Sequence, residues 1–171
     1  MKKAYLFIFL LLRSNILLAD SANACELVYF SEHDGAKVLL TQKVFDGGFQ
    51  ELAIVHQEAN AQEKVTRLSF AGSKENGCHF PAFSSLKGGE WGWHVVWTSS
   101  ANQGVFYARV DGDAWVSSLP KRLSRDLAEK VTISETQGQL IITMRYSSNL
   151  DLHEQQFFSE DEGRSWKKLA P

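Results

Sequence analysis

The chain has 171 residues, with 18 basic and 20 acidic side chains and a formal net charge of −2 at pH 7. This small net charge does not indicate the basic surface that nucleic-acid binding requires, and it does not suggest attraction to an anionic membrane surface. The length is sufficient for one domain with a modest hydrophobic core.

The first predicted element is a signal peptide over residues 1–24. Two lysines precede an apolar run over residues 4–12, and an Ala-Asn-Ala sequence ends at Ala24. This order is typical of a bacterial secretory signal peptide. The apolar run is too short to cross a bilayer, which needs about 20 residues. Cleavage after Ala24 would leave residues 25–171 as a single domain in the periplasm or outside the cell.

The two cysteines, Cys25 and Cys78, both remain after that cleavage. In an oxidising compartment a lone pair of cysteines most simply forms a disulfide. Closing a loop of about 50 residues would stabilise the fold by roughly 2–4 kcal/mol. The alternative is a lipid on Cys25, although the preceding residues match the usual lipobox only at the small residue before the cysteine.

Nine short strands are predicted after residue 25, and each mixes β-branched and aromatic residues with polar ones. They cover residues 26–30, 37–42, 50–57, 65–71, 93–99, 105–111, 131–135, 140–146 and 153–159. Turn clusters rich in aspartate, asparagine and glycine separate several of them. Only residues 123–131 have helical spacing, and this short stretch is interpreted as a turn of helix or a loop. The sequence therefore predicts an all-β protein.

Four of the turns follow one plan, in which an aromatic strand end is followed by a polar turn with glycine and by a new strand. Their centres lie near residues 34, 76, 112 and 162, which is a spacing of about 36 to 50 residues. Such a period is typical of propeller or solenoid repeats, and one unit would hold about four strands. We predict a small or partial β-propeller of about three to four four-stranded blades.

The last turn carries the clearest motif, Ser159-x-Asp161-x-Gly163-x-Ser165-Trp166. It resembles the Asp-box, or BNR repeat, of sialidase-like β-propellers at every signature position, whereas the earlier turns match only in part. In that family these turns lie at the blade periphery, so the resemblance implies a structural role. Asp161 would accept backbone hydrogen bonds, Gly163 would supply a positive φ, and Trp166 would pack beneath the hairpin. The stretch does not provide the ligand series of a calcium loop.

The same resemblance raises the question of glycosidase activity. A sialidase-like enzyme has six blades, three arginines on the substrate carboxylate, a Tyr–Glu nucleophile pair and an aspartate acid/base. Arg67, Arg109 and Arg145 occur once per unit on predicted strands, and their convergence would favour a reduced glycosidase. No tyrosine can be paired with a particular glutamate, so no catalytic residue is predicted. The scattered histidines show no zinc spacing, and we expect no metal and no cofactor.

A glycine-rich stretch over residues 84–97 is the main candidate for binding, because it contains Trp91, Trp93 and His94. Tryptophan is frequent at binding hot spots. Trp93 and His94 would face opposite ways on a strand. The alternative is that Trp93 and Trp97 fill the core between blades.

We expect an exported, non-enzymatic binding protein whose partner is another protein or a glycan. A small periplasmic inhibitor or immunity-type protein stands first, on the basis of size, export and a single disulfide. A glycan-binding module is the alternative, favoured if Trp91 and Tyr146 are exposed together; Tyr146 belongs to a polar hairpin predicted over residues 144–156. Arg109 and Arg145 are further binding candidates. Open sheet edges would require closure by the N-terminal strands or a homodimer.

Overall fold

The computed structural model describes residues 29–33, 36–45, 49–57, 63–69, 82–88, 92–100, 102–112, 116–148 and 151–169. Within these residues the chain forms β-strands and no helix. The predicted signal peptide, the predicted disulfide between Cys25 and Cys78, and Trp91 lie outside the described residues.

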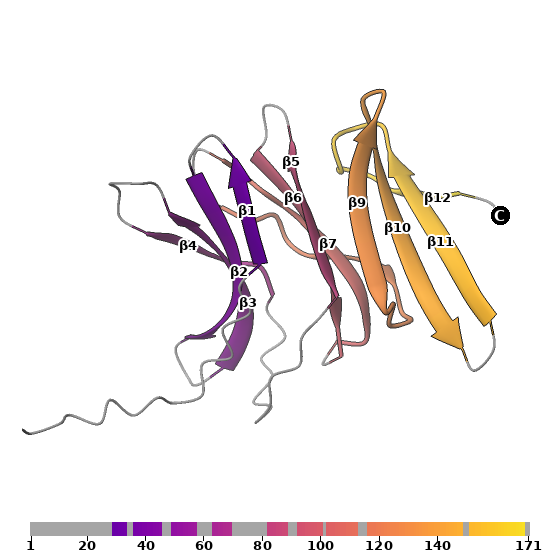
Figure 1. Cartoon of the computed structure of the whole chain (residues 1–171), viewed down its shortest axis with the longest axis horizontal. Helices are drawn as coiled ribbons and strands as arrows, with labels where there is room; N and C mark the ends of the chain where they lie inside the picture. Colours follow the sequence, from indigo (N-terminus) through magenta and orange to yellow (C-terminus); the bar gives the residue numbers. More distant parts are fainter. Residues whose placement is uncertain are drawn as a thin grey trace, which may run out of the picture.

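Three four-stranded antiparallel sheets follow one another along the chain, and the strands of each sheet are neighbours in sequence order (Figure 1). The first sheet contains β1 (Tyr29–His33), β2 (Ala36–Phe45), β3 (Phe49–Gln57) and β4 (Lys64–Arg67). The second contains β5 (Phe83–Gly88), β6 (Gly92–Ser99), β7 (Gly104–Val110) and β8 (Lys121–Ser124). The third contains β9 (Lys130–Thr136), β10 (Gln139–Ser148), β11 (Asp151–Ser159) and β12 (Lys167–Lys168). The predicted all-β fold of a partial propeller is confirmed.

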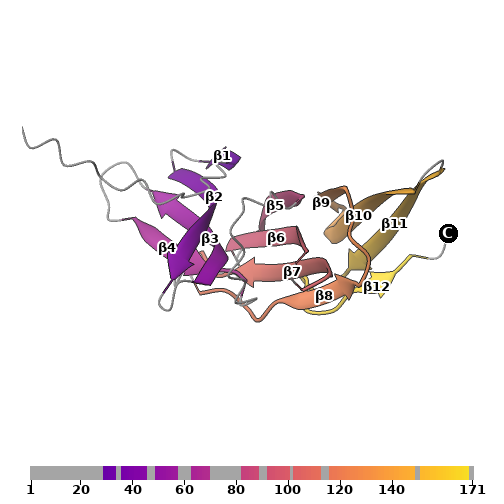
Figure 2. The ribbon, with the colours of Figure 1, turned by 90° about the horizontal axis from the view of Figure 1, so that it is seen from below.

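The three sheets stand in a row, as the blades of a propeller do. In Figure 2 the first strands β1, β5 and β9 lie along one side of the molecule, and the last strands β4, β8 and β12 lie toward the other. Contacts of β9 with β5 and with β6 join the third sheet to the second. The second sheet is therefore covered on both faces, and its central strand β6 is buried almost throughout.

The interface between the first and second sheets is one half of the core. Because side chains alternate along a strand, Trp93, Val95 and Trp97 share the face of β6 that looks toward the first sheet. They form a buried cluster with Leu52 and Ile54 of β3. The continuous apolar run of β6 follows from this position, since a strand buried on both faces needs no polar side.

The interface between the second and third sheets is the other half of the core. Val96 and Tyr107 lie on the opposite face of the second sheet and pack against Ile142 and Met144 of β10 and Val131 of β9. Each fully buried apolar side chain contributes about 1.5–3 kcal/mol. The two interfaces hold the row of sheets together.

Three strands were not predicted: β5, β8 and β12. The serines and glycines around β5 indicated a loose loop, but β5 and β6 form a hairpin that ends where Gly88 faces Gly92. Gly92 has φ +90, and an added Cβ would lie 2.3 Å from the backbone nitrogen of Gly112, so only glycine fits there. Residues 123–131 were expected to form a turn of helix or a loop, and they contain no helix: Leu123 belongs to β8, Val131 belongs to β9, and residues 125–129 between them are a loop.

The predicted alignment of four turns is correct only for the last two. The turns near residues 112 and 162 each join the third and fourth strands of a sheet. The turn near residue 34 joins β1 and β2, and residue 76 lies outside the described residues, between β4 and β5. Aspartate and glycine are favoured wherever antiparallel strands reverse, so their recurrence does not require a structural repeat.

Candidate functional site

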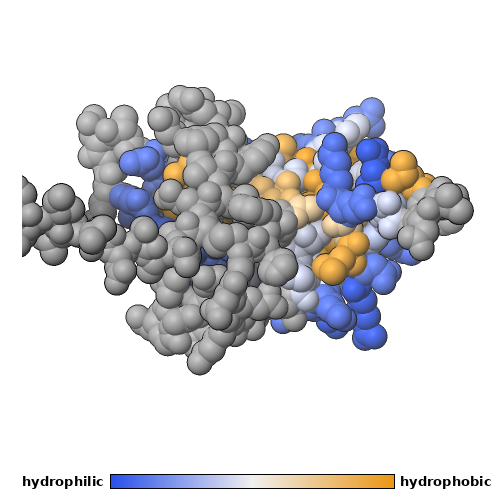
Figure 3. Space-filling view, turned by 60° about the horizontal axis from the view of Figure 1, so that its bottom comes forward, coloured by the Kyte–Doolittle hydropathy of each residue, from blue (hydrophilic) through white to orange (hydrophobic). Residues whose placement is uncertain are grey.

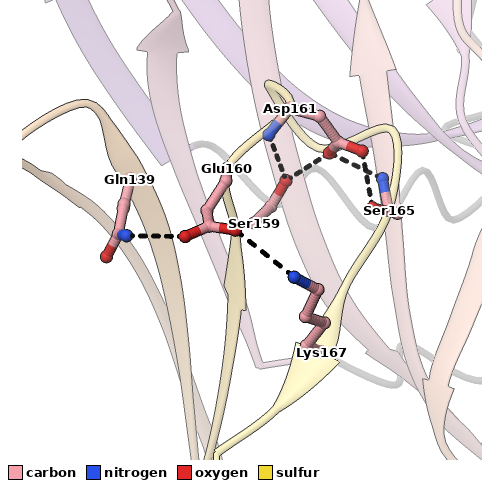
Figure 4. A network of polar contacts seen from close by, with 6 residues as sticks. All are labelled: Gln139, Ser159, Glu160, Asp161, Ser165 and Lys167. Carbon is pink, nitrogen blue, oxygen red and sulfur yellow. Dashed lines mark hydrogen bonds and ion pairs between the residues drawn. The ribbon is translucent and has the colours of Figure 1, made fainter.

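The turn between β11 and β12 is closed by its own polar side chains (Figure 4). The Ser159 hydroxyl donates a hydrogen bond to Asp161 Oδ1 at 2.7 Å and accepts one from the Gly163 N–H at 2.8 Å. The Asp161 carboxylate also accepts hydrogen bonds from the Ser165 N–H at 2.8 Å and the Ser165 hydroxyl at 2.5 Å. The Ser165 hydroxyl and then its N–H contribute most to lowering the pKa of Asp161 from 3.8 to about 2.

A second set of contacts in the same picture ties this turn to the third sheet. Glu160 accepts hydrogen bonds from Gln139 at 3.1 Å and from Lys167 at 3.3 Å (Figure 4). Both contacts are exposed, so each contributes little to stability. They orient the turn rather than form a reactive group.

The same turn also packs against the second sheet through Tyr107 of β7. The ring of Trp166 meets the ring of Tyr107 edge-on, with centroids 4.8 Å apart. Gly163 has φ +79, and an added Cβ would lie 1.7 Å from the Tyr107 hydroxyl oxygen. Arg109 donates a hydrogen bond from Nη1 to the backbone oxygen of Glu162 at 3.5 Å. The motif therefore joins two sheets, which is a structural role.

His94 of β6 lies next to Tyr107 and is 3% exposed. Its Nδ1 shares a hydrogen bond of 2.7 Å with the Tyr107 hydroxyl, and its Nε2 lies against Gly88. Burial, and next the nearby Arg109 charge, lower the pKa of His94 from 6.5 to about 4. Burial likewise raises the pKa of Tyr107. Both groups are neutral at pH 7, and their burial keeps them from direct contact with a ligand.

Two of the three arginines considered for a glycosidase site, Arg67 and Arg145, belong to different sheets. Arg67 donates hydrogen bonds to the buried Glu51 carboxylate at 2.8 Å and to the backbone of Ser69 at 3.0 Å, within the first sheet. Arg145 forms an ion pair of 2.6 Å with Glu154 on the third sheet. Met144, next to Arg145, points into the second interface, so Arg145 points away from it. Arg67 and Arg145 are therefore held by different carboxylates on different sheets.

Two of the aromatic residues considered for binding are in the core. Trp93 is buried at the first interface, where the alternative interpretation placed it together with Trp97. Tyr146 is 6% exposed, donates a hydrogen bond to the Ser124 hydroxyl at 3.0 Å and stacks on the ring of His153. Neither ring offers a face to a sugar or to a partner protein.

A different region does present apolar side chains to solvent, and we call it the outer edge. It comprises residues 116–124. Residues 116–118 contact β7 and the residue after it through an isolated bridge and backbone hydrogen bonds, and β8 (Lys121–Ser124) is the last strand of the second sheet. Val116 is 62% exposed and Leu119 is 84% exposed. On the side of the molecule in Figure 3, the described residues are mostly hydrophilic and apolar ones form small separate groups.

An open pocket of about 450 Å³ adjoins the outer edge and is lined by Asn102, Gln103, Arg122 and Arg125. The two amides come from the turn between β6 and β7, whereas Arg122 lies within β8 and Arg125 directly follows that strand. This site was not predicted from the sequence. The signal for it is the basic stretch Lys-Arg-Leu-Ser-Arg over residues 121–125.

Among the described residues no group of three or more histidine, cysteine, aspartate or glutamate side chains is arranged to hold a metal ion. In the same part of the chain no helix is long and apolar enough to cross a membrane.

Comparisons with known proteins find matches among solved structures only. No protein-family profile matches the chain. No curated protein sequence matches it either. Among solved structures, it is similar to the GH32 beta-fructofuranosidase BmSUC1 of Bombyx mori, with 16% identity and a TM-score of 0.42. The likeness covers 82% of this chain and 33% of that enzyme, so the chain spans about a third of the length of the protein it matches.

Proposed function

We propose that this protein is an exported, non-catalytic binding protein of the inhibitor or immunity type, which acts by contact with another protein. The observation that carries the proposal is the outer edge of the second sheet. It has Val116 and Leu119 exposed in the segment before β8, Arg122 exposed in β8, and Arg125 exposed directly after that strand. Contiguous apolar groups with a polar rim mark interaction surfaces, and Leu119, the most exposed large apolar side chain among the described residues, would lie at the centre of such a surface.

The backbone of the outer edge supports the same proposal. The Val116 carbonyl accepts the Asp111 N–H at 3.0 Å, and the Ser118 N–H donates to the Arg109 carbonyl at 2.8 Å. These bonds attach one side of the segment to β7. Because β8 (Lys121–Ser124) is last in the sheet order, its other side is a sheet edge, and such edges recruit strands of partner proteins. Residues 116–118 are partly engaged, since the Ser117 hydroxyl donates a hydrogen bond to the Arg67 carbonyl of β4 at 2.7 Å.

We also propose that residues 159–166 are an Asp-box of the sialidase-like type. The support is the set of hydrogen bonds among Ser159, Asp161 and Ser165 and the position between the third and fourth strands of a sheet. An Asp-box is a fold signature and carries no activity, so this proposal agrees with a binding role.

The two alternatives have less support. Joint exposure of Trp91 and Tyr146 would favour a glycan-binding module, and Tyr146 is buried. A reduced glycosidase was favoured only if the three arginines converged, and Arg67 and Arg145 belong to different sheets with different carboxylate partners.

The test is affinity capture of partners from the source organism with a tagged protein expressed from the full sequence. Leu119→Asp places a charge in the outer edge. Leu152→Asp is the matched control, because Leu152 is also a leucine and is 73% exposed on β11 of the third sheet. We expect one stoichiometric protein that wild type and Leu152→Asp retain and Leu119→Asp loses. Equal retention by all three variants would contradict the proposed surface, and capture of no protein would contradict the proposed function.

A further inference from the structure

The pocket beside the outer edge is built from groups suited to one ligand chemistry. Two of its four lining residues carry guanidinium groups and two carry carboxamides. None of the four is acidic, so the lining has a formal charge of +2 from Arg122 and Arg125. Guanidinium groups bind planar oxyanions with two parallel hydrogen bonds, and amide N–H groups add donors.

These side chains are not engaged elsewhere in the described part of the chain. The ion pairs there involve Lys43, Arg67, Arg145 and Lys167, and neither Arg122 nor Arg125 takes part in one. The side chains of Asn102 and Gln103 likewise make no hydrogen bond within the described residues. A pair of unengaged guanidinium groups in one pocket repel each other, and a bound anion would relieve that repulsion.

The backbone holds the pocket in place through an irregularity of β8. Ser124 faces Val105 and Arg122 faces Phe106, so Leu123 is an extra residue in the strand. Such a bulge changes the direction in which the neighbouring side chains point. Leu123 packs at the second interface and Ser124 accepts the Tyr146 hydroxyl, whereas Arg122 remains exposed beside the turn.

Gly104 follows the turn between β6 and β7 and allows that turn to lie close to β8. Its φ is +140, and an added Cβ would lie 2.1 Å from the backbone oxygen of Ser124 and 3.3 Å from Cδ of Arg122. The aliphatic stem of Arg122 therefore lies against the glycine, and Arg122 lines the same pocket as Asn102 and Gln103. The backbone geometry of β7 and β8 therefore determines where the pocket lies.

We infer that this pocket binds a carboxylate, and that its source is an aspartate or glutamate side chain of the partner protein. The inference rests on the proposed function, since the pocket adjoins the outer edge. Val116 and Leu119 would provide apolar contact, and the pocket would take an acidic side chain from the same partner surface. Charged groups at the rim of an interface mainly increase the rate of association and select the partner.

The probe is the blocked dipeptide Ac-Glu-Glu-NH2, titrated into the full chain labelled with ¹⁵N and followed by NMR. We expect the amide signals of Asn102 and Gln103 and the Nε–H signals of Arg122 and Arg125 to shift, with a dissociation constant in the millimolar range at low salt. The neutral dipeptide Ac-Gln-Gln-NH2 should cause no shift. The double variant Arg122→Gln/Arg125→Gln should bind about tenfold more weakly, and the control Arg164→Gln should bind as wild type does.

Several outcomes would overturn the inference. These are no shift with the acidic peptide, equal shifts with both peptides, or binding of free succinate alone, which would assign the pocket to a small carboxylate and not to a protein. The capture experiment separates this failure from that of the proposed function. If Arg122→Gln/Arg125→Gln retains the partner and Leu119→Asp loses it, the outer edge binds a protein and the pocket does not contribute.

Discussion

The two interfaces between the sheets are built differently. The first depends on large apolar side chains, with Trp93 and Trp97 packed against the first sheet. A hydrogen bond from the Ser117 hydroxyl to the Arg67 carbonyl at 2.7 Å also joins the first two sheets, outside that apolar cluster. The second interface also has an apolar cluster, but members of the cluster itself form hydrogen bonds with the facing sheet. The Tyr146 hydroxyl reaches Ser124 at 3.0 Å, and the Ile133 N–H reaches the Ser84 hydroxyl at 3.2 Å.

The difference indicates how each pair of sheets is fixed. Hydrophobic burial has no direction, so it holds two sheets together without setting their relative position closely. Hydrogen bonds have strict distances and angles, so the second interface sets the position of the third sheet on the second. The turn containing Asp161 and Gly163 adds to this by packing on Tyr107.

The largest expected effect is at the first interface. Trp97→Ala removes a buried ring, and large-to-small changes of this kind cost about 3–5 kcal/mol of unfolding free energy. The matched change at the second interface is Trp166→Ala. Trp166 is only half-buried, and its ring N–H has no hydrogen-bond partner among the described residues, so we expect a loss of about 1–3 kcal/mol. Urea unfolding followed by circular dichroism measures both values, and an equal or reversed order would show that the two interfaces are not built as described.

The next effect isolates the contact between the last turn and Tyr107. Gly163→Ala forces a Cβ into the Tyr107 hydroxyl and strains a residue at φ +79, which should destabilise the fold by about 2–4 kcal/mol. Gly138→Ala is the matched control, because Gly138 has φ +77 but its Cβ would meet nothing within 4 Å. It should cost only the backbone strain, about 1 kcal/mol. The difference in urea midpoint between the two variants measures how much the packing of the turn on Tyr107 contributes to stability. Equal losses in the two variants would contradict a contribution from this packing.

The strands with a clear hydrophobic pattern could be predicted from the sequence. The run Trp-His-Val-Val-Trp of β6 has β-branched and aromatic residues throughout, and it is a strand. By contrast, β5 and β8 consist largely of serine, lysine and arginine. Their strand conformation comes from pairing with β6 and β7, and that tertiary context is not visible in local propensity.

The same distinction between local sequence pattern and tertiary context applies to the candidate site. The turn at residues 159–166 has local contacts, so its motif could be recognised from spacing alone. The pocket could not, because Gln103 and Arg122 are brought together by the pairing of β7 with β8 and by a bulge. Likewise, the burial of Tyr146 depends on Ser124, which is 22 residues away in sequence.

The smallest expected effect is a dependence of stability on pH that arises at the second interface. The pKa of His94 is lowered from 6.5 to about 4 in the folded protein. Between these pH values the unfolded chain binds more protons than the folded one, so stability falls as the pH falls through this window. Between pH 7 and pH 5 the loss should be about 2 kcal/mol. Asp161, with a pKa of about 2, remains ionised throughout.

His94→Gln tests whether this dependence belongs to the second interface. Glutamine can still form a hydrogen bond with Tyr107 but does not titrate, so the variant should lose most of the 2 kcal/mol difference between pH 7 and pH 5. His153 is exposed in both proteins and provides the same background. Urea unfolding at the two pH values measures the effect. An unchanged difference in the variant would mean that His94 binds protons equally well when folded and unfolded, and that the second interface admits water to its polar groups.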